Sequence, residues 1–265
     1  MNATTHKTAI LVGAPSWARS FNATKNRAQE GAPTGYVVRR ASMIAGLWFA
    51  ATAAGAQPLP PEWQPFNPAP KANPTKYTLE DSPDGPVIRA DADHSMSGLI
   101  RKQQIDLART PLLRWRWRIE RPLTTADLKT KAGDDYAARV YVLFDYDVSR
   151  LPWLTRSKLA LAKAIYGVDV PAAALNYVWD NRYPVDTITP NTYTDRARMV
   201  VIESGGAKAG QWVTETRDVA ADFRAAFGED APPVIAVAIA TDTDNTGERA
   251  TAWYGSIEFI PRDKE

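Results

Sequence analysis

Apolar and polar residues alternate in short runs from Lys76 onward, and this period of two predicts β-strands. Turn residues separate ten such runs. They span residues 76–80, 86–90, 95–101, 112–120, 136–147, 174–180, 196–203, 212–219, 234–241 and 250–260. A parallel sheet would need a crossover helix after most strands, and few helices are predicted. The pattern therefore predicts an all-β fold, an antiparallel β-sandwich or barrel.

Two stretches depart from this alternation and favour helices. Residues 153–166 carry Leu154, Leu161 and Ile165 at roughly helical spacing. Residues 220–227 are followed by Gly228, a typical C-terminal helix cap. We therefore expect one or two short helices in an otherwise β-rich domain.

The run 112–120 has two contrasting faces. One face carries Leu113, Trp115, Trp117 and Ile119, and the other carries Arg114, Arg116 and Arg118. We predict that the aromatic face lies in the core. The arginines are then either a solvated row or part of a sheet face that holds an anionic or sugar ligand.

Two further strands add candidate binding residues. In the run 136–147, Arg139 and Tyr141 lie opposite an apolar face, and Asp135 has the same parity. The small residues Ala236, Ala238 and Ala240 share one side of a late strand and would leave a groove beside such long side chains. Trp179, followed by polar residues, is either a stacking platform for a sugar ring or a core residue. The predicted ligand-binding residues are Arg116, Asp135, Arg139, Tyr141 and Trp179.

The loop 241–248 superficially resembles a calcium site, with Asp242, Asp244 and Asn245 as candidate ligands. An EF-hand spreads its ligands over twelve residues between two helices, and that context is absent here. Asp and Asn are also ordinary turn residues. We therefore favour turn chemistry and expect neither calcium nor another cofactor.

The composition excludes several classes of protein. The chain of 265 residues has no Cys, which rules out disulfides and Cys-ligated zinc or iron–sulfur sites. Only two His residues are present, so a multi-histidine metal site or a Ser-His-Asp hydrolase lacks its usual parts.

The N-terminal region is typical of an export signal. Arg39-Arg40 precede an apolar run over residues 41–51, and an A-x-A cleavage signal follows at 54–56. The apolar run is too short for a stable membrane span after processing. We interpret residues 35–56 as a signal peptide and residues 1–34 as an extension upstream of the true start, which predicts a periplasmic or secreted protein.

Proline and charge distinguish the next segments. Seven prolines predict an extended arm over residues 57–75, before a sandwich domain over 76–265.

Residues 1–56 hold six of the 32 Lys and Arg residues and one of the 30 acidic residues. The remainder therefore has 26 basic and 29 acidic residues, a net charge of −3, and no general attraction for nucleic acid.

Several motifs together resemble a family of exported bacterial proteins, the domain of unknown function 3047. They are SGL at 97–99, LRWRW at 113–117, AGDDYAARVYV at 132–142, LNYVW at 175–179, DVAADF at 218–223 and TDTDNT at 241–246. The resemblance implies a single secreted domain with a jelly-roll-like sandwich fold, similar to carbohydrate-binding modules. It implies no established activity and no catalytic residues.

Three functions remain open from the sequence. The leading hypothesis is binding of a glycan or envelope polymer on a polar sheet face. The second is a polysaccharide lyase or hydrolase in the same groove, with Tyr141 as a base whose pKa neighbouring arginines would have to lower. The third is a structural or interaction protein without a small-molecule ligand.

Overall fold

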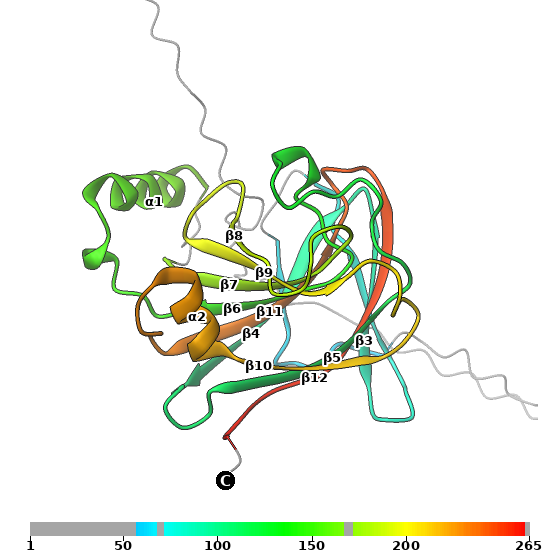
Figure 1. Ribbon diagram of the computed structural model, residues 1–265. Helices are drawn as coiled ribbons and strands as arrows, with labels where there is room; N and C mark the ends of the chain where they lie inside the picture. The colour runs from blue at the N-terminus through cyan, green and yellow to red at the C-terminus, as the bar shows by residue number, and fades with distance from the viewer. Residues whose placement is uncertain (1–56, 68–71, 167–171, 263–265) are drawn as a thin grey trace, which may run out of the picture.

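The computed structural model describes residues 57–67, 72–166 and 172–262. The predicted signal peptide and the upstream extension lie outside these residues. The described chain forms two β-sheets stacked face to face, a β-sandwich (Figure 1). Within the described part of the chain, no helix is both long and apolar enough to cross a membrane.

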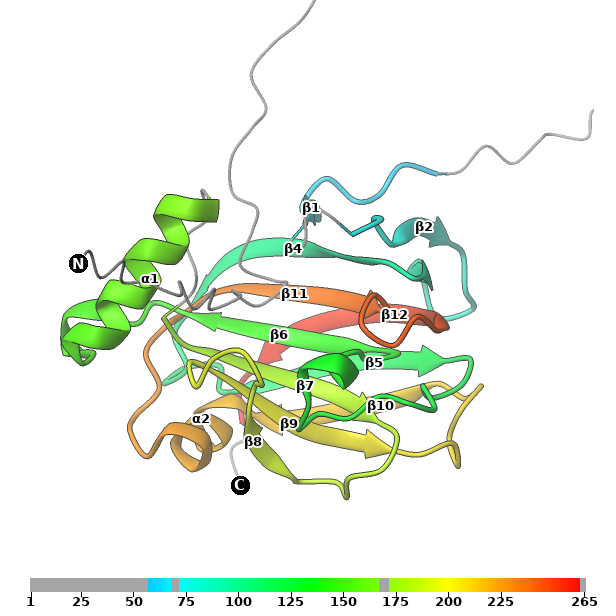
Figure 2. The ribbon, with the colours of Figure 1, turned by 90° about the horizontal axis from the view of Figure 1, so that it is seen from above.

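The two sheets contain seven and five strands. The larger sheet has the order β1 (Gln64–Phe66), β4 (Met96–Ile105), β11 (Val234–Asp242), β6 (Arg139–Phe144), β7 (Ala174–Asp180), β9 (Ala197–Ser204) and β8 (Ile188–Pro190). The smaller sheet has the order β10 (Val213–Asp218), β5 (Leu112–Ile119), β12 (Arg249–Ile260), β3 (Val87–Asp93) and β2 (Lys76–Glu80). Figure 2 shows the two sheets one behind the other, with helix α1 (Trp153–Tyr166) beyond one end of the strands.

All ten predicted strands and both predicted helices are present. Helix α1 has the predicted bounds, and α2 (Val219–Phe227) begins one residue earlier than predicted. The Asp218 carboxylate caps α2 by accepting a hydrogen bond from the backbone N–H of Ala221. Gly228 ends the helix with a φ of 74°, a left-handed conformation that favours glycine.

The proline-rich arm is part of the fold. Regular structure was predicted to begin only after it, and this is wrong because Gln64–Phe66 pairs with β4 as β1. Trp63 and Phe66 are both buried. An edge strand tolerates proline because one side of its backbone needs no ladder hydrogen bonds, which explains Pro65 in β1.

The predicted β-sandwich is confirmed, but one of its strand pairs departs from the predicted antiparallel pairing. Strands β7 and β9 pair in parallel, and the short strand β8 between them in sequence pairs with the far side of β9. The alternation of apolar and polar residues shows which face of a strand a side chain occupies. It carries no information on the direction of the neighbouring strand.

The alternation of β5 places its large apolar side chains in the core, as predicted. Trp115 is 1% exposed, and its ring stacks on Tyr177 of the opposite sheet at a centroid distance of 5.2 Å. Trp117 packs edge-on against Trp115 at 5.5 Å. These rings join the two sheets, so much of the burial that stabilises the sandwich depends on them.

Trp115→Ala should lower the free energy of unfolding by about 3–5 kcal/mol, because it removes a fully buried ring between the sheets. Trp153→Ala is the matched control, since Trp153 in α1 is 70% exposed. Denaturant unfolding of both variants measures the difference. Equal stability of the two variants would contradict the assignment of the strand faces.

Candidate functional site

The five predicted binding residues do not form one site. Arg139 and Tyr141 lie on β6 with side chains on the outer face of the seven-stranded sheet, and Asp135 lies in the loop before β6. Arg116 lies on β5 of the other sheet, and Trp179 lies between the sheets. The predicted set is therefore divided among three places in the sandwich.

Trp179 belongs to the core and is not a platform for a sugar ring. It is 2% exposed, and its ring lies 5.7 Å from that of Trp117. Its indole N–H donates to the carbonyl of Gly205. Trp179 has the same parity as Leu175 and Tyr177, whose side chains also point into the core. That parity in the sequence favoured the core interpretation.

Arg116 lies on the outer face of the five-stranded sheet and is separated from Arg139 by the whole sandwich. Its guanidinium donates to Asp84 at 2.5 Å and to Ser82, and it stacks over the ring of Trp212. A Cβ atom at Gly255 would lie 2.4 Å from Arg116 Nε, so glycine at this bulge gives the side chain room to lie across β12.

Small and large side chains alternate across the outer face of the seven-stranded sheet, as the sequence predicted. Ala240 lies opposite Arg139, and Ala238 lies opposite Tyr141. On the other side of β6, Tyr141 pairs with Asn176 of β7. The face is closed, however: Arg139 is 1% exposed and Tyr141 is 3% exposed.

A buried ion pair lies at one end of this face. Arg139 Nη2 donates to Asp242 Oδ2 at 2.6 Å, and both side chains are almost fully buried. The guanidinium lies over the rings of Tyr136 and Tyr141, at 5.2 and 5.1 Å from their centroids. Burial raises the pKa of Asp242, and the charge of Arg139 offsets part of that rise.

Asp135 has a different role from the one predicted. Its carboxylate accepts hydrogen bonds from the backbone N–H groups of Asn245 and Thr246 and from the Thr246 hydroxyl at 2.7 Å. Asn245 also donates its side-chain amide to the same carboxylate at 3.0 Å. Asp135 therefore ties the loop before β6 to the loop that follows β11.

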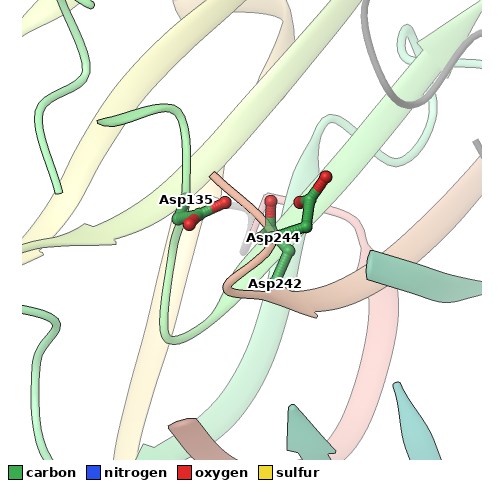
Figure 3. Close-up of side chains that lie close together, drawn as sticks. All are labelled: Asp135, Asp242 and Asp244. Carbon is green, nitrogen blue, oxygen red and sulfur yellow. The ribbon is translucent and has the colours of Figure 1, made fainter. Parts of the chain in front are cut away.

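Three carboxylates converge where these two loops meet. One oxygen from each of Asp135, Asp242 and Asp244 lies within 4.8 Å of the other two. Figure 3 shows Asp135 reaching from its loop toward the chain segment that carries Asp242 and Asp244. Of the predicted metal candidates, Asn245 instead donates its amide to Asp135.

The hydrogen bonds of this triad fit a closed network better than a calcium site. Both oxygens of Asp135 and both oxygens of Asp242 already accept hydrogen bonds from N–H or O–H groups. A calcium ion takes six to eight oxygen ligands, and these hydrogen bonds already use part of the acceptor capacity of both carboxylates. The arrangement consequently favours structural turn chemistry.

Asp134 adds a fourth carboxylate that the sequence analysis did not select for this face. It accepts hydrogen bonds from the Tyr136 hydroxyl and from the Asn191 side-chain amide. Burial raises the pKa of Asp134 to about 6, although the charge of Arg139 opposes the rise. The cluster therefore tends to hold a proton. The adjacent Asp134-Asp135 pair was the feature of the sequence that could have pointed to this carboxylate.

Three buried polar atoms on this face have no hydrogen-bond partner among the described residues: Arg139 Nε, Tyr141 Oη and Asn176 Oδ1. The side chain of Asn176 lies near the phenol of Tyr141, but neither Tyr141 Oη nor Asn176 Oδ1 has a hydrogen-bond partner. Burial raises the pKa of Tyr141, and Arg139 lowers it only in part. The arrangement does not support Tyr141 as a general base.

Asp134→Asn should remove a pH dependence of stability between about pH 4 and pH 6. A carboxyl with a raised pKa in the folded state is stabilising when protonated, and this contribution is lost as the pH rises through the folded pKa. The variant should match the wild type at pH 4 and exceed its free energy of unfolding at pH 7 by up to about 3 kcal/mol. Urea unfolding at both pH values tests this, and a difference that is constant with pH would contradict it.

Comparison with known proteins gives structural neighbours of low similarity. A family 12 xyloglucanase from Bacillus licheniformis aligns with a TM-score of 0.40 and 8% identity, over 73% of this chain and 89% of the xyloglucanase. The family 30 carbohydrate-binding module of a cellulosomal cellulase from Clostridium thermocellum aligns with a TM-score of 0.33 and 10% identity, over 72% of this chain and 84% of the module.

No curated protein matches the sequence. The sequence family described as "Protein of unknown function (DUF3047)" matches residues 61–258, which include every strand of the larger sheet and all of the smaller sheet except the end of β12. The match covers well over half of the chain and begins within the proline-rich arm that supplies β1. The chain therefore belongs to the DUF3047 family.

Proposed function

We propose that this protein binds a glycan, or a related envelope polymer, on the outer face of its seven-stranded sheet. The binding groups are Arg139, Tyr141 and Asn176. We also propose that it acts in the periplasm or outside the cell, which the export-signal pattern of residues 35–56 supports.

The observation that carries this proposal is the group of three buried polar atoms without partners on adjacent strands. A buried donor or acceptor without a hydrogen bond costs about 1–3 kcal/mol. Folded proteins keep few such atoms, and a ligand or an ordered water often explains them. Their grouping on one face favours a shared ligand over three unrelated packing defects.

A sugar matches the chemistry of these atoms. Arg139 Nε offers an N–H donor, Asn176 Oδ1 offers an acceptor, and the phenol of Tyr141 can act as either. Sugar hydroxyls also donate and accept, so one ring can satisfy all three. Ala238 and Ala240 are the cross-strand neighbours of Tyr141 and Arg139, and their small side chains occupy little of the space next to these groups.

Binding in this place requires local opening, because the side chains of Arg139, Tyr141 and Asn176 are all buried. When a ligand binds, the three groups form hydrogen bonds that they lack in the free protein. The free energy of these hydrogen bonds offsets part of the free energy of local opening.

Tyr141→Phe should weaken glycan binding about 2- to 10-fold, which corresponds to the loss of one hydrogen bond of about 0.5–1.5 kcal/mol. It should not lower the stability of the free protein, because the removed hydroxyl has no partner there. Affinity electrophoresis in neutral soluble polysaccharides, xylan and mixed-linkage β-glucan among them, measures binding. Thermal unfolding measures stability.

Tyr254→Phe is the matched control for stability. The Tyr254 hydroxyl donates to the carbonyl of Ala240 at 2.6 Å and bonds the Thr241 hydroxyl, so its loss should cost about 1 kcal/mol or more. If Tyr141→Phe destabilises the protein as much as Tyr254→Phe and leaves binding unchanged, the phenol of Tyr141 is structural and the proposed site is wrong.

A hydrolase acting on the same face is the second candidate. Asp134, with a pKa of about 6, has the proton affinity expected of a general acid near neutral pH. The raised pKa of Tyr141 argues against the lyase mechanism in which tyrosine is the base. Release of reducing ends from a bound polysaccharide, lost in Asp134→Asn, would favour the hydrolase over the binding protein.

A further inference from the structure

Arginine and tryptophan side chains alternate in a row across the outer face of the five-stranded sheet. The row consists of Arg89, Trp253, Arg118 and Trp212. Trp253 of β12 lies opposite Arg89 of β3 on one side and opposite Arg118 of β5 on the other. Trp212 comes directly before β10, which continues the row to the edge of the sheet.

Cation–π contacts hold the row together. The Arg118 guanidinium lies 3.8 Å from the ring centroid of Trp253 and 5.4 Å from that of Trp212. Arg89 lies 5.5 Å from the ring of Trp253, and the indole N–H of Trp253 donates to Glu80. Stacking of this kind fixes the plane of each guanidinium and reduces the entropy lost when it binds a partner.

Arg118 differs from the other arginines of this face in its charge environment. Arg89 pairs with Glu80 and Asp91, Arg114 pairs with Glu258, and Arg116 pairs with Asp84. Among the described residues, no carboxylate pairs with Arg118, and its Nε has no hydrogen-bond partner. Of these four arginines, Arg118 is the one without a paired carboxylate, whereas Arg89 has two.

We infer that Arg118 is the centre of a second binding surface, which recognises the carboxylate of an acidic polysaccharide. A guanidinium binds a carboxylate through two parallel N–H···O bonds, and its planar fork fits this geometry. The surface is accessible, since Arg118, Trp212 and Trp253 are all partly exposed. It lies on the sheet opposite to Tyr141 and does not depend on the proposed function of that face.

The surroundings of Arg118 favour a uronic acid over a dense polyanion. Two carboxylates, Glu80 and Asp91, face the single charge of Arg89, and Asp84 pairs with Arg116. The surroundings of Arg118 therefore carry no excess positive charge that would attract the many phosphates of a nucleic acid or an anionic membrane. A single ring carboxylate needs only one guanidinium. The partly exposed indoles of Trp212 and Trp253 offer apolar surface to the sugar ring that carries it.

Isothermal titration of the full folded domain with polygalacturonate, and with fully methyl-esterified polygalacturonate, tests this inference. The two polymers share their sugar and linkage, but only the first carries carboxylates. The wild type should bind polygalacturonate at least about tenfold more tightly, the difference expected for a charge-assisted hydrogen bond. Raising the NaCl concentration should weaken binding of the acidic polymer far more than binding of the ester.

Arg118→Gln should abolish the preference for the acidic polymer. Arg114→Gln is the matched control, because it removes a paired arginine from the same face of the same strand. It should keep the preference, and so should Tyr141→Phe on the other sheet. The melting temperature of each variant shows whether it is folded.

Three results would overturn the inference: equal binding of the two polymers by the wild type, a preference that persists in folded Arg118→Gln, or a preference lost equally in Arg114→Gln. Tighter binding to phosphatidylglycerol vesicles than to polygalacturonate would also overturn it in favour of a lipid phosphate. The comparison of two polymers on the wild type needs no variant, so equal binding would overturn the inference even if Arg118→Gln fails to fold.

Discussion

The buried ion pair between Arg139 and Asp242 is the constraint on which the proposed site depends. Burying a charge without a partner is costly, so each group requires the other. The pair joins the start of β6 to the end of β11. The loop that follows β11 is held in turn by Asp135, through Asn245 and Thr246. The ion pair and the hydrogen bonds of Asp135 therefore hold the two loops and their carboxylates together.

In our proposal, the inner faces of the two sheets provide stability and their outer faces provide recognition. The inner faces are largely apolar and meet through Trp115, Trp117 and Tyr177. The polar atoms of Trp117 and Tyr177 donate to the carboxylates of Glu215 and Asp222. The outer face of the larger sheet contains buried polar groups, and that of the smaller sheet contains partly exposed arginine and tryptophan side chains. Substitutions of partly exposed residues on the outer face of the smaller sheet consequently leave this apolar core in place.

The sequence was sufficient for most of the fold because the period of two depends only on which face of a strand is buried. It predicted the core role of Trp115 and the neighbouring positions of Arg139 and Tyr141 on the other face. It was not sufficient for the site, because register and strand direction decide which distant residues meet. For this reason Asp242 was considered only as a turn or metal residue, Arg116 was grouped with Arg139 although the two lie on different sheets, and the parallel pairing of β7 with β9 was missed.

The most direct test of this account is a double-mutant cycle on the buried ion pair, measured as free energies of unfolding in urea at pH 7. Arg139→Met should cost about 3–5 kcal/mol, because it leaves the Asp242 carboxylate buried without compensation. Arg139→Met combined with Asp242→Leu should recover most of this loss, which gives a large coupling energy. Additive effects of the two substitutions would show that the pair does not hold this face together and would contradict the account.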